Sequence, residues 1–109
     1  MVLNLQRAIS RFILDLTVYS LTETRTAGEV AESFTESTLF LAPFTLTPET
    51  LKYYPAGSYT YNDFRFYQIG AATLPERSII AYNGNYYRVN EIKDRAYEGN
   101  YSHYMAKVM

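Results

Sequence analysis

Cysteine and tryptophan are both absent from this chain of 109 residues. Without cysteine there is no disulfide framework and no thiolate-ligated zinc or iron–sulfur site. No apolar run approaches the roughly 20 residues of a membrane-spanning helix, and the first ten residues lack the long apolar centre of a signal peptide. We therefore expect a soluble protein of a reducing compartment, without membrane contact.

The chain also has no large excess of positive or negative charge. The ten lysines and arginines nearly balance the eleven aspartates and glutamates, which gives a formal net charge of −1. This balance gives no electrostatic reason for nucleic acid or an anionic membrane to be the main partner. The length is that of one domain with one core.

The residues that usually carry catalysis are scarce. His103 is the single histidine, and no serine lies in a nucleophile-elbow sequence. Counting alone leaves open a triad with Asp15, Asp63 or Asp94, but a lone histidine within a strand is more often a surface or interface residue. Phosphate-binding glycine loops, dinucleotide fingerprints and calcium loops are missing. We expect no enzyme activity, no metal site and no cofactor.

Aromatic side chains, by contrast, are abundant. The chain has twelve tyrosines and six phenylalanines, more rings than the interior of a small barrel holds. Tyrosine suits surfaces that become buried on assembly, because its ring is apolar and its tip polar. We expect some of these rings to form a subunit interface, and the candidates are Tyr53, Tyr54, Tyr67, Tyr97 and Tyr101.

Alternating apolar residues indicate a chain made mostly of strands. In residues 11–21 the alternation places Phe12, Leu14, Leu16 and Val18 on one buried face. The other expected strand regions are residues 34–46 with core positions Leu39, Leu41 and Phe44, residues 58–69 with a bulge near Asn62 and Asp63, and three strands in residues 78–109 with turns at residues 83–85 and 98–100. Five or six short strands predict an all-β fold, a small β-barrel or barrel-like sandwich.

One short helix is expected between the second and third strand regions. Thr47 is a suitable N-cap, Pro48 suits the first helical position, and Glu49 is favourable in the first turn. Pro55 and Gly57 should end the helix after about two turns. Residues 1–10 form a separate N-terminal arm or short helix in this interpretation, and residues 11–109 form the barrel domain.

Two polar segments interrupt the strands. Residues 22–33 are rich in threonine and glutamate, and they form either a long hairpin running into solvent or a projecting loop that touches a partner or lines a pore. Residues 70–77 are the second loop. Basic residues interleaved with aromatics in residues 65–95 leave open an OB-like module that binds single-stranded nucleic acid or peptide, although the nearby carboxylates weigh against a basic groove.

The order of these features resembles the head closure (stopper or collar) proteins in the neck of tailed bacteriophages. The resemblance rests on the helix Leu46-Thr-Pro-Glu-Thr-Leu51 with Tyr54-Pro-Ala-Gly57 after it, on the strand Phe64-Arg-Phe-Tyr67, on Tyr82-Asn-Gly-Asn-Tyr-Tyr-Arg-Val89, and on the final Tyr101-Ser-His-Tyr-Met-Ala106. The chain departs from the family in its tyrosine content and in having Arg95-Ala-Tyr97 where a tryptophan is common. Tail terminator and tail completion proteins are similar in size and β content, so they remain the alternative.

The resemblance implies a structural virion protein that assembles with itself into a ring of six or twelve copies. Such a ring joins the portal–adaptor complex to the tail or its terminator protein, helps to close or line the channel, and touches double-stranded DNA transiently. The location would be the virion neck, with assembly in the host cytoplasm. Residues 1–10 would be a docking arm. The candidate channel or partner positions are Thr26, Ala27, Gly28, Glu29 and Glu32 in the first loop and Ala71, Thr73 and Glu76 in the second.

Overall fold

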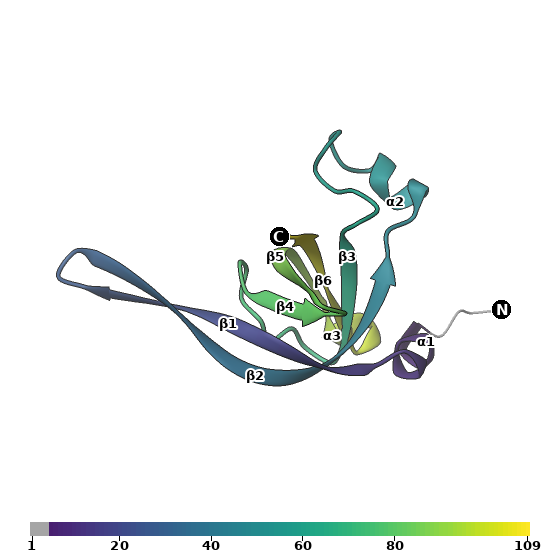
Figure 1. Cartoon of the computed structure of the whole chain (residues 1–109). Coiled ribbons are helices and arrows are strands. Elements are labelled where there is room, and N and C mark those ends of the chain that lie inside the picture. The colour runs from purple at the N-terminus through teal and green to yellow at the C-terminus, as the bar shows by residue number, and fades with distance from the viewer. Residues whose placement is uncertain (1–4) are drawn as a thin grey trace.

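Six antiparallel strands close into a barrel in the order β1-β2-β3-β6-β5-β4, with β4 returning to β1. The computed structural model describes residues 5–109 and is shown in Figure 1. The all-β barrel expected from the alternating pattern is therefore confirmed. The strands are β1 (Leu14–Thr26), β2 (Glu29–Thr45), β3 (Phe64–Ile69), β4 (Ile79–Tyr82), β5 (Asn85–Arg95) and β6 (Tyr101–Val108).

Within residues 5–109, three short helical segments lie outside the barrel wall, where one was expected: α1 (Leu5–Arg11), α2 (Pro48–Lys52) and α3 (Ala96–Gly99). The predicted helix start at α2 is confirmed. The Oγ1 of Thr47 accepts a hydrogen bond from the Thr50 N–H at 3.2 Å, and Pro48 occupies the first turn, where its missing N–H costs nothing. Residues 1–4 of the expected docking arm lie outside the described residues.

The barrel interior is a single apolar cluster. Strand alternation directs every second side chain inward, and the inward set includes Leu16, Val18, Leu41, Phe66 and Tyr104, all at most 8% exposed. The strand prediction for residues 11–21 is wrong at its start, because helix α1 extends to Arg11 and β1 begins only at Leu14.

The misplaced strand start also changes the expected core. Phe12 is 56% exposed and packs edge-on against Phe44, while Leu14 is 44% exposed at the open end of the β1–β2 ladder. Neither side chain belongs to the barrel interior.

Two smaller clusters cover parts of the outer wall. Ile9 of α1 packs against Ala42 and Tyr67, and the segment after β2 places Leu46 and Tyr59 over Met105. These outer layers explain why so many aromatic side chains fit: the protein buries rings on both sides of its β3 and β6 strands.

The third strand region is shorter than predicted. β3 begins at Phe64, and Asp63 ends a loop where a bulge was expected. The Asp63 carboxylate is 1% exposed and accepts hydrogen bonds from the Thr60 N–H at 2.8 Å and the Val108 N–H at 2.9 Å. A β-bulge does occur, but it lies between Val89 and Glu91 of β5.

The expected turns have mixed outcomes. Asn83 and Gly84 form a two-residue hairpin turn with φ of 50° and 80°, as their side chains favour. The turn predicted at residues 98–100 is instead the helical turn α3, which ends at Asn100 in the left-handed conformation, φ 54°. The chain around residues 22–33 is the long hairpin of the two alternatives, with Ala27 and Gly28 (φ 52° and 84°) as its turn.

Candidate functional site: the hairpin arm and its base

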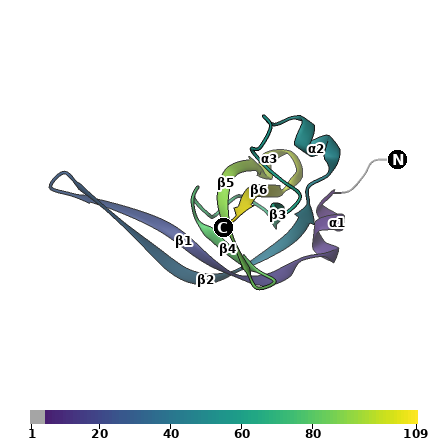
Figure 2. The same ribbon diagram turned by 45° about the horizontal axis from the view of Figure 1, so that its top comes forward.

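A two-stranded arm extends from the barrel wall. All 13 residues of β1 pair with β2, but β4 pairs with β1 only at Val18 and Tyr19, and β3 pairs with β2 only over residues 42–45. Residues 20–37, which we call the arm, therefore have no further strand on either edge within the described part of the chain. The arm runs away from the barrel in both views (Figures 1 and 2), and the molecule measures 56 × 30 × 28 Å.

The two faces of the arm differ in chemistry. Residues that pair across the hairpin share a face, so the register separates two sets. One face carries small side chains, and the other carries larger apolar and charged ones. The first set is Ser20, Thr22, Thr24, Thr26, Glu29, Ala31, Ser33, Thr35 and Ser37, in which Glu29 at the tip is the one charged residue, and the second is Leu21, Glu23, Arg25, Val30, Glu32, Phe34 and Glu36.

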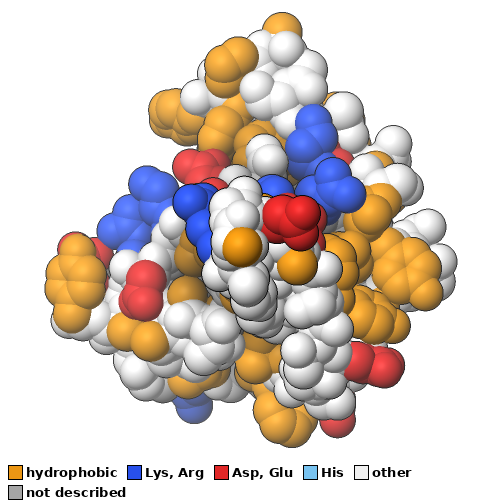
Figure 3. All heavy atoms as spheres, turned by 90° about the vertical axis from the view of Figure 1, so that its left-hand side faces the viewer, with side chains coloured by type: hydrophobic (Ala, Val, Ile, Leu, Met, Phe, Trp, Pro, Cys, Tyr) orange, Lys and Arg blue, Asp and Glu red, His pale blue; other side chains and the backbone are white. Residues whose placement is uncertain are grey.

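The arm is acidic, whereas the opposite wall of the barrel is basic. Four glutamates and one arginine give the arm a formal charge of −3. Strands β3, β5 and β6 together carry five lysines and arginines against two acidic residues, a formal charge of +3. Seen from the side on which the arm projects, acidic and basic side chains are interspersed with hydrophobic ones (Figure 3), so this face has no continuous basic groove.

The base of the arm is joined to the second predicted loop. Arg77 forms an ion pair with Glu32, Nη1 to Oε1 at 2.9 Å, and a second ion pair with Glu23. Glu23 and Glu32 lie directly opposite each other on the two strands, where like charges would repel. The structure thus brings the two candidate loop regions together, and Arg77 neutralises the repulsion between their paired glutamates.

Residues 70–77 are held firmly on the barrel. The hydroxyl of the fully buried Tyr104 accepts hydrogen bonds from the backbone N–H groups of Thr73 (2.8 Å) and Leu74 (3.1 Å) and donates one to Gln68 Oε1 (2.5 Å). The Asp94 carboxylate accepts hydrogen bonds from the N–H groups of Ala96 and Ala72, which lower the pKa of that carboxyl. This loop is an anchored platform for the arm.

The predicted loop positions therefore fall into two groups. Thr26, Ala27, Gly28 and Glu29 form the arm tip, and Glu32 lies lower, against Arg77. On the platform, Ala71 and Glu76 are exposed, while Thr73 Oγ1 accepts a hydrogen bond from Gln68 Nε2 at 3.1 Å. Sequence reasoning missed Arg77 as the link between the two groups, because its partners Glu32 and Glu23 lie 45 and 54 residues away in the sequence.

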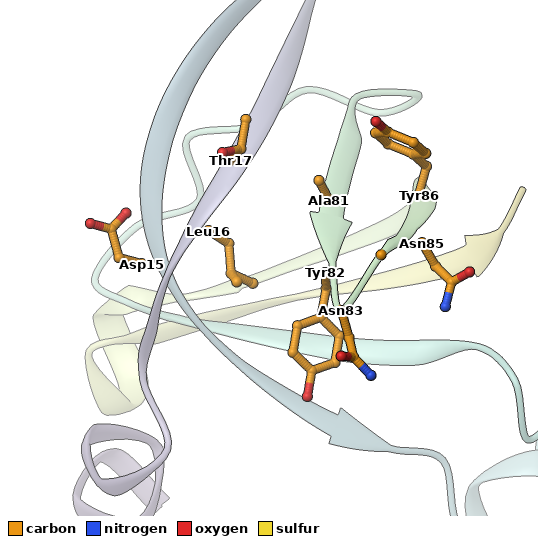
Figure 4. A pocket seen from close by; sticks show the side chains of 9 residues that line it. Asp15, Leu16, Thr17, Ala81, Tyr82, Asn83, Asn85 and Tyr86 are labelled. Atoms are coloured by element: carbon orange, nitrogen blue, oxygen red, sulfur yellow. The ribbon is translucent and has the colours of Figure 1, made fainter.

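A cavity of about 300 Å³ opens between the start of β1 and the Asn83-Gly84 turn, where β4 separates from β1. Figure 4 shows Leu16 and Thr17 of β1 on one side and Ala81 and Tyr82 of β4 on the other, with Asp15 directed away from them. A second opening of about 490 Å³ at the barrel mouth shares Tyr82 with it. In the first lining the carboxylate of Asp15 points away from the hydroxyl of Thr17 (Figure 4), and the second lining holds neither a carboxylate nor a histidine.

The candidate interface tyrosines do not form one patch. Tyr53 and Tyr97 are 87% and 84% exposed, but they belong to α2 and α3, which lie at opposite ends of the barrel in Figure 1. Tyr54 packs edge-on against Tyr59, with ring centroids 4.8 Å apart; burial and Glu91 raise its pKa. Tyr101 is half-buried beside Tyr67.

The prediction that Tyr67 is an interface residue is wrong. Its side chain is only 9% exposed, because α1 covers the outer face of β3. Two exposed rings that sequence reasoning did not single out are Phe34 (48%) and Phe40 (60%) on β2. Their pairing with Leu21 and Asp15 places them on the same face of the β1–β2 ladder.

His103 has no catalytic surroundings. Its ring lies edge-on to Tyr67 at 5.4 Å, and its Nδ1 has no hydrogen-bond partner among the described residues. Burial, with help from Arg65, Arg95 and Lys93, lowers its pKa from 6.5 to about 4, so the ring is neutral at pH 7. Within residues 5–109 no cluster of histidine and carboxylate side chains is suited to a metal ion, and no helix is long and apolar enough to span a membrane.

Comparison with known proteins supports the fold and nothing finer. No protein-family model matches the chain, and no curated protein matches it. Among solved structures, it is similar to the solution structure of protein SF1141 from Shigella flexneri 2a, with a TM-score of 0.61 and 17% sequence identity over 88% of this chain and 92% of that one. At this level of identity, the two proteins share a fold.

Proposed function

We propose that this protein is a ring-forming structural component of the neck of a tailed bacteriophage, where it joins the portal–adaptor complex to the tail and helps to close or line the DNA channel. The proposal combines the resemblance of roughly residues 11–109 to head closure proteins with the architecture of the chain. In this function the protein is a virion component that is assembled in the host cytoplasm, and its contact with double-stranded DNA is transient.

The observation that carries the proposal is the uncovered arm. A two-stranded ribbon is marginally stable in water, because its backbone edges and both of its faces are solvated. Residues 22–38 are all exposed, among them the apolar Val30 and Phe34. A ribbon of this length that leaves its own barrel is well suited to contacts with other subunits, and it contributes nothing to the barrel core.

The charge of the arm fits a position near passing DNA. Phosphates are repelled by the arm's net negative charge, so DNA moves past without sticking. The serine and threonine face, which carries a charge only at Glu29 near the tip, would permit brief contact. The exposed Tyr53 and Tyr97, at opposite ends of the barrel, are suited to the rings above and below, which would be the portal–adaptor complex and the tail or its terminator protein.

A register-preserving deletion tests the proposal. Removal of residues 22–26 and 29–33 joins Leu21 through the Ala27-Gly28 turn to its natural partner Phe34. The barrel should stay folded, while particles assembled with this variant should lose DNA or fail to attach tails. Normal DNA retention and normal tail attachment in such particles would refute the role of the arm.

Binding experiments separate this function from its alternatives. The full-length protein mixed with the portal–adaptor complex of its phage should form a ring on that complex in negative-stain images. Binding to the tail tube instead of the portal–adaptor complex would identify a tail terminator or tail completion protein. Salt-dependent binding to single-stranded oligonucleotides, without self-association, would favour the OB-like module.

A further inference from the structure

The opening at the mouth of the barrel is lined without charge. Its volume of about 490 Å³ lies within the range of about 300–1,000 Å³ that is usual for ligand pockets. Four aromatic rings, three asparagines and Val108 line it, and none of these side chains carries a charge at pH 7. An uncharged lining suits an uncharged ligand, because a buried charge would find no partner there.

The aromatic rings form the inner part of this opening. Phe64 meets Tyr82 and Tyr87 edge-on, with ring centroids 5.4 and 5.3 Å away. Tyr87 is 3% exposed, whereas Tyr61 at the outside is 64% exposed. Because the inner rings pack against the barrel core, they need little reordering when a ligand arrives. The mouth thus presents aromatic surface in a fixed arrangement.

Hydrogen-bond donors surround these rings. They belong to Asn62, Asn83 and Asn85, which we call the rim asparagines and which are all exposed. Figure 4 shows two of them on either side of the turn between β4 and β5. The side-chain amides of Asn62 and Asn83 make no hydrogen bond with the described residues. Each amide has two N–H donors, so the rim can donate to the carbonyl oxygens of a ligand.

The backbone of the mouth offers little to an ordinary extended peptide, which binds by adding a strand to a sheet edge. Strand β4 pairs with β5 along its whole length and with β1 at Ile79 and Ile80, so only Ala81 and Tyr82 keep a free edge. Recognition at the mouth therefore depends on side chains. Proline-rich segments match rings and N–H donors, because their own rings pack on aromatic side chains and their backbone has carbonyl acceptors but few N–H groups.

We propose that the barrel mouth binds an uncharged, proline-rich segment of a partner protein in the polyproline II conformation. The prolines pack on Tyr61, Phe64 and Tyr82, and the rim asparagines donate hydrogen bonds to the carbonyl oxygens between them. Such a segment is extended before it binds, so the binding costs little conformational entropy. No lining residue of the mouth belongs to the arm, and the inference does not depend on the proposed neck function.

Acetylated decaproline is the probe for this site, because its residues carry carbonyl groups and no backbone N–H. Added to the isotope-labelled full-length protein, it should shift the side-chain amide signals of the rim asparagines in nuclear magnetic resonance spectra, and the shifts should saturate. A glycine–serine peptide of the same length is the control ligand. It is flexible and has no rings, so it should leave these signals unchanged.

The substitution Asn83→Asp tests the role of the amides. The carboxylate keeps the shape of the side chain and tolerates the left-handed backbone at this position (φ 50°), but it removes the donor and repels carbonyl oxygens. Binding of decaproline should weaken by about fivefold or more. The matched control is Asn100→Asp, which adds the same charge at an exposed left-handed position (φ 54°) outside the mouth and should bind like the wild type.

Three results would overturn the inference. The first is a wild-type protein whose rim signals do not respond to decaproline, and the second is an Asn83→Asp variant that binds it as tightly as the wild type. The third is an equal response to the glycine–serine peptide, which would show that the mouth accepts extended chains in general. None of these measurements involves ring formation or the portal–adaptor complex, so each outcome leaves the neck function to its own test.

Discussion

Tyr104→Phe is the substitution that best tests how the platform of residues 70–77 is held. The change removes one oxygen from a fully buried side chain and keeps the ring that packs in the barrel core. That oxygen accepts from the N–H groups of Thr73 and Leu74 and donates to Gln68. The substitution therefore breaks three hydrogen bonds without creating a ring-sized cavity.

The expected loss in the free energy of unfolding depends on whether each former hydrogen-bond partner of the Tyr104 hydroxyl can bond elsewhere. Leu74 is 6% exposed, so its N–H loses its acceptor with little access to water, at a cost of about 1–3 kcal/mol. Thr73 is exposed, and its N–H can bond to water. Gln68 keeps its contact with the Thr73 hydroxyl. We expect a total loss of about 2–3 kcal/mol in the free energy of unfolding, or about 10 °C in Tm for a domain of this size.

Urea denaturation, with hydrogen exchange at the Thr73 and Leu74 amides, measures this effect. Exchange at both amides should become faster in the Tyr104→Phe variant. Tyr53→Phe, at an 87% exposed position, is the matched control and should leave both readouts unchanged. A loss below about 0.5 kcal/mol with unchanged exchange would show that the hydroxyl does not anchor the platform, and the reasoning above would be refuted.

Two further predictions concern charged groups. Arg77→Ala should change the free energy of unfolding by less than about 1 kcal/mol, because its ion pairs with Glu23 and Glu32 are exposed. Amide exchange in residues 20–26 should nevertheless become faster. Unchanged exchange would show that Arg77 does not hold the base of the arm. His103 has a folded-state pKa of about 4, below its ordinary 6.5, so the unfolded chain takes up its proton first as the pH falls. The neutral His103 ring therefore makes its full contribution to stability above pH 6.5, and this contribution is lost as the pH falls toward 4. In the His103→Gln variant, the urea midpoint should depend less on pH between those values. An equally steep decline of the midpoint in the variant would show that other groups cause it.

Local chemistry made part of this fold predictable. The Asn83-Gly84 turn and the helix start at Thr47 depend on residues within a few positions of each other, and both occur as expected. The alternation that places Leu16 and Val18 inside depends only on the period of a strand. The prediction at residues 98–100 was wrong because Asn100 serves equally well at the end of a helical turn as in a hairpin.

Contacts between distant segments explain the remaining errors. The local sequence predicts a bulge at Asp63, but the carboxylate of this residue is fixed by the N–H of Val108, 45 residues away. The strand pattern predicts that Tyr67 lies on the surface, and it does not show that α1 packs over this side chain. The arm was one of two open alternatives, because threonine-rich segments suit both strands and loops. The link through Arg77 requires knowing which loop lies at the arm's base.

The net charge of −1 conceals an uneven distribution of charge in the fold. A chain with evenly mixed charges and the same total would give a neighbour no preferred orientation. Here the arm holds −3 and strands β3, β5 and β6 hold +3, so a contact between two arms would bring like charges together. Unlike patches can meet either head to tail or reciprocally across a two-fold axis, and only the head-to-tail contact is compatible with the proposed ring. Salt screens attraction between such patches over about 10 Å, so any self-association that they drive should weaken as the ionic strength rises.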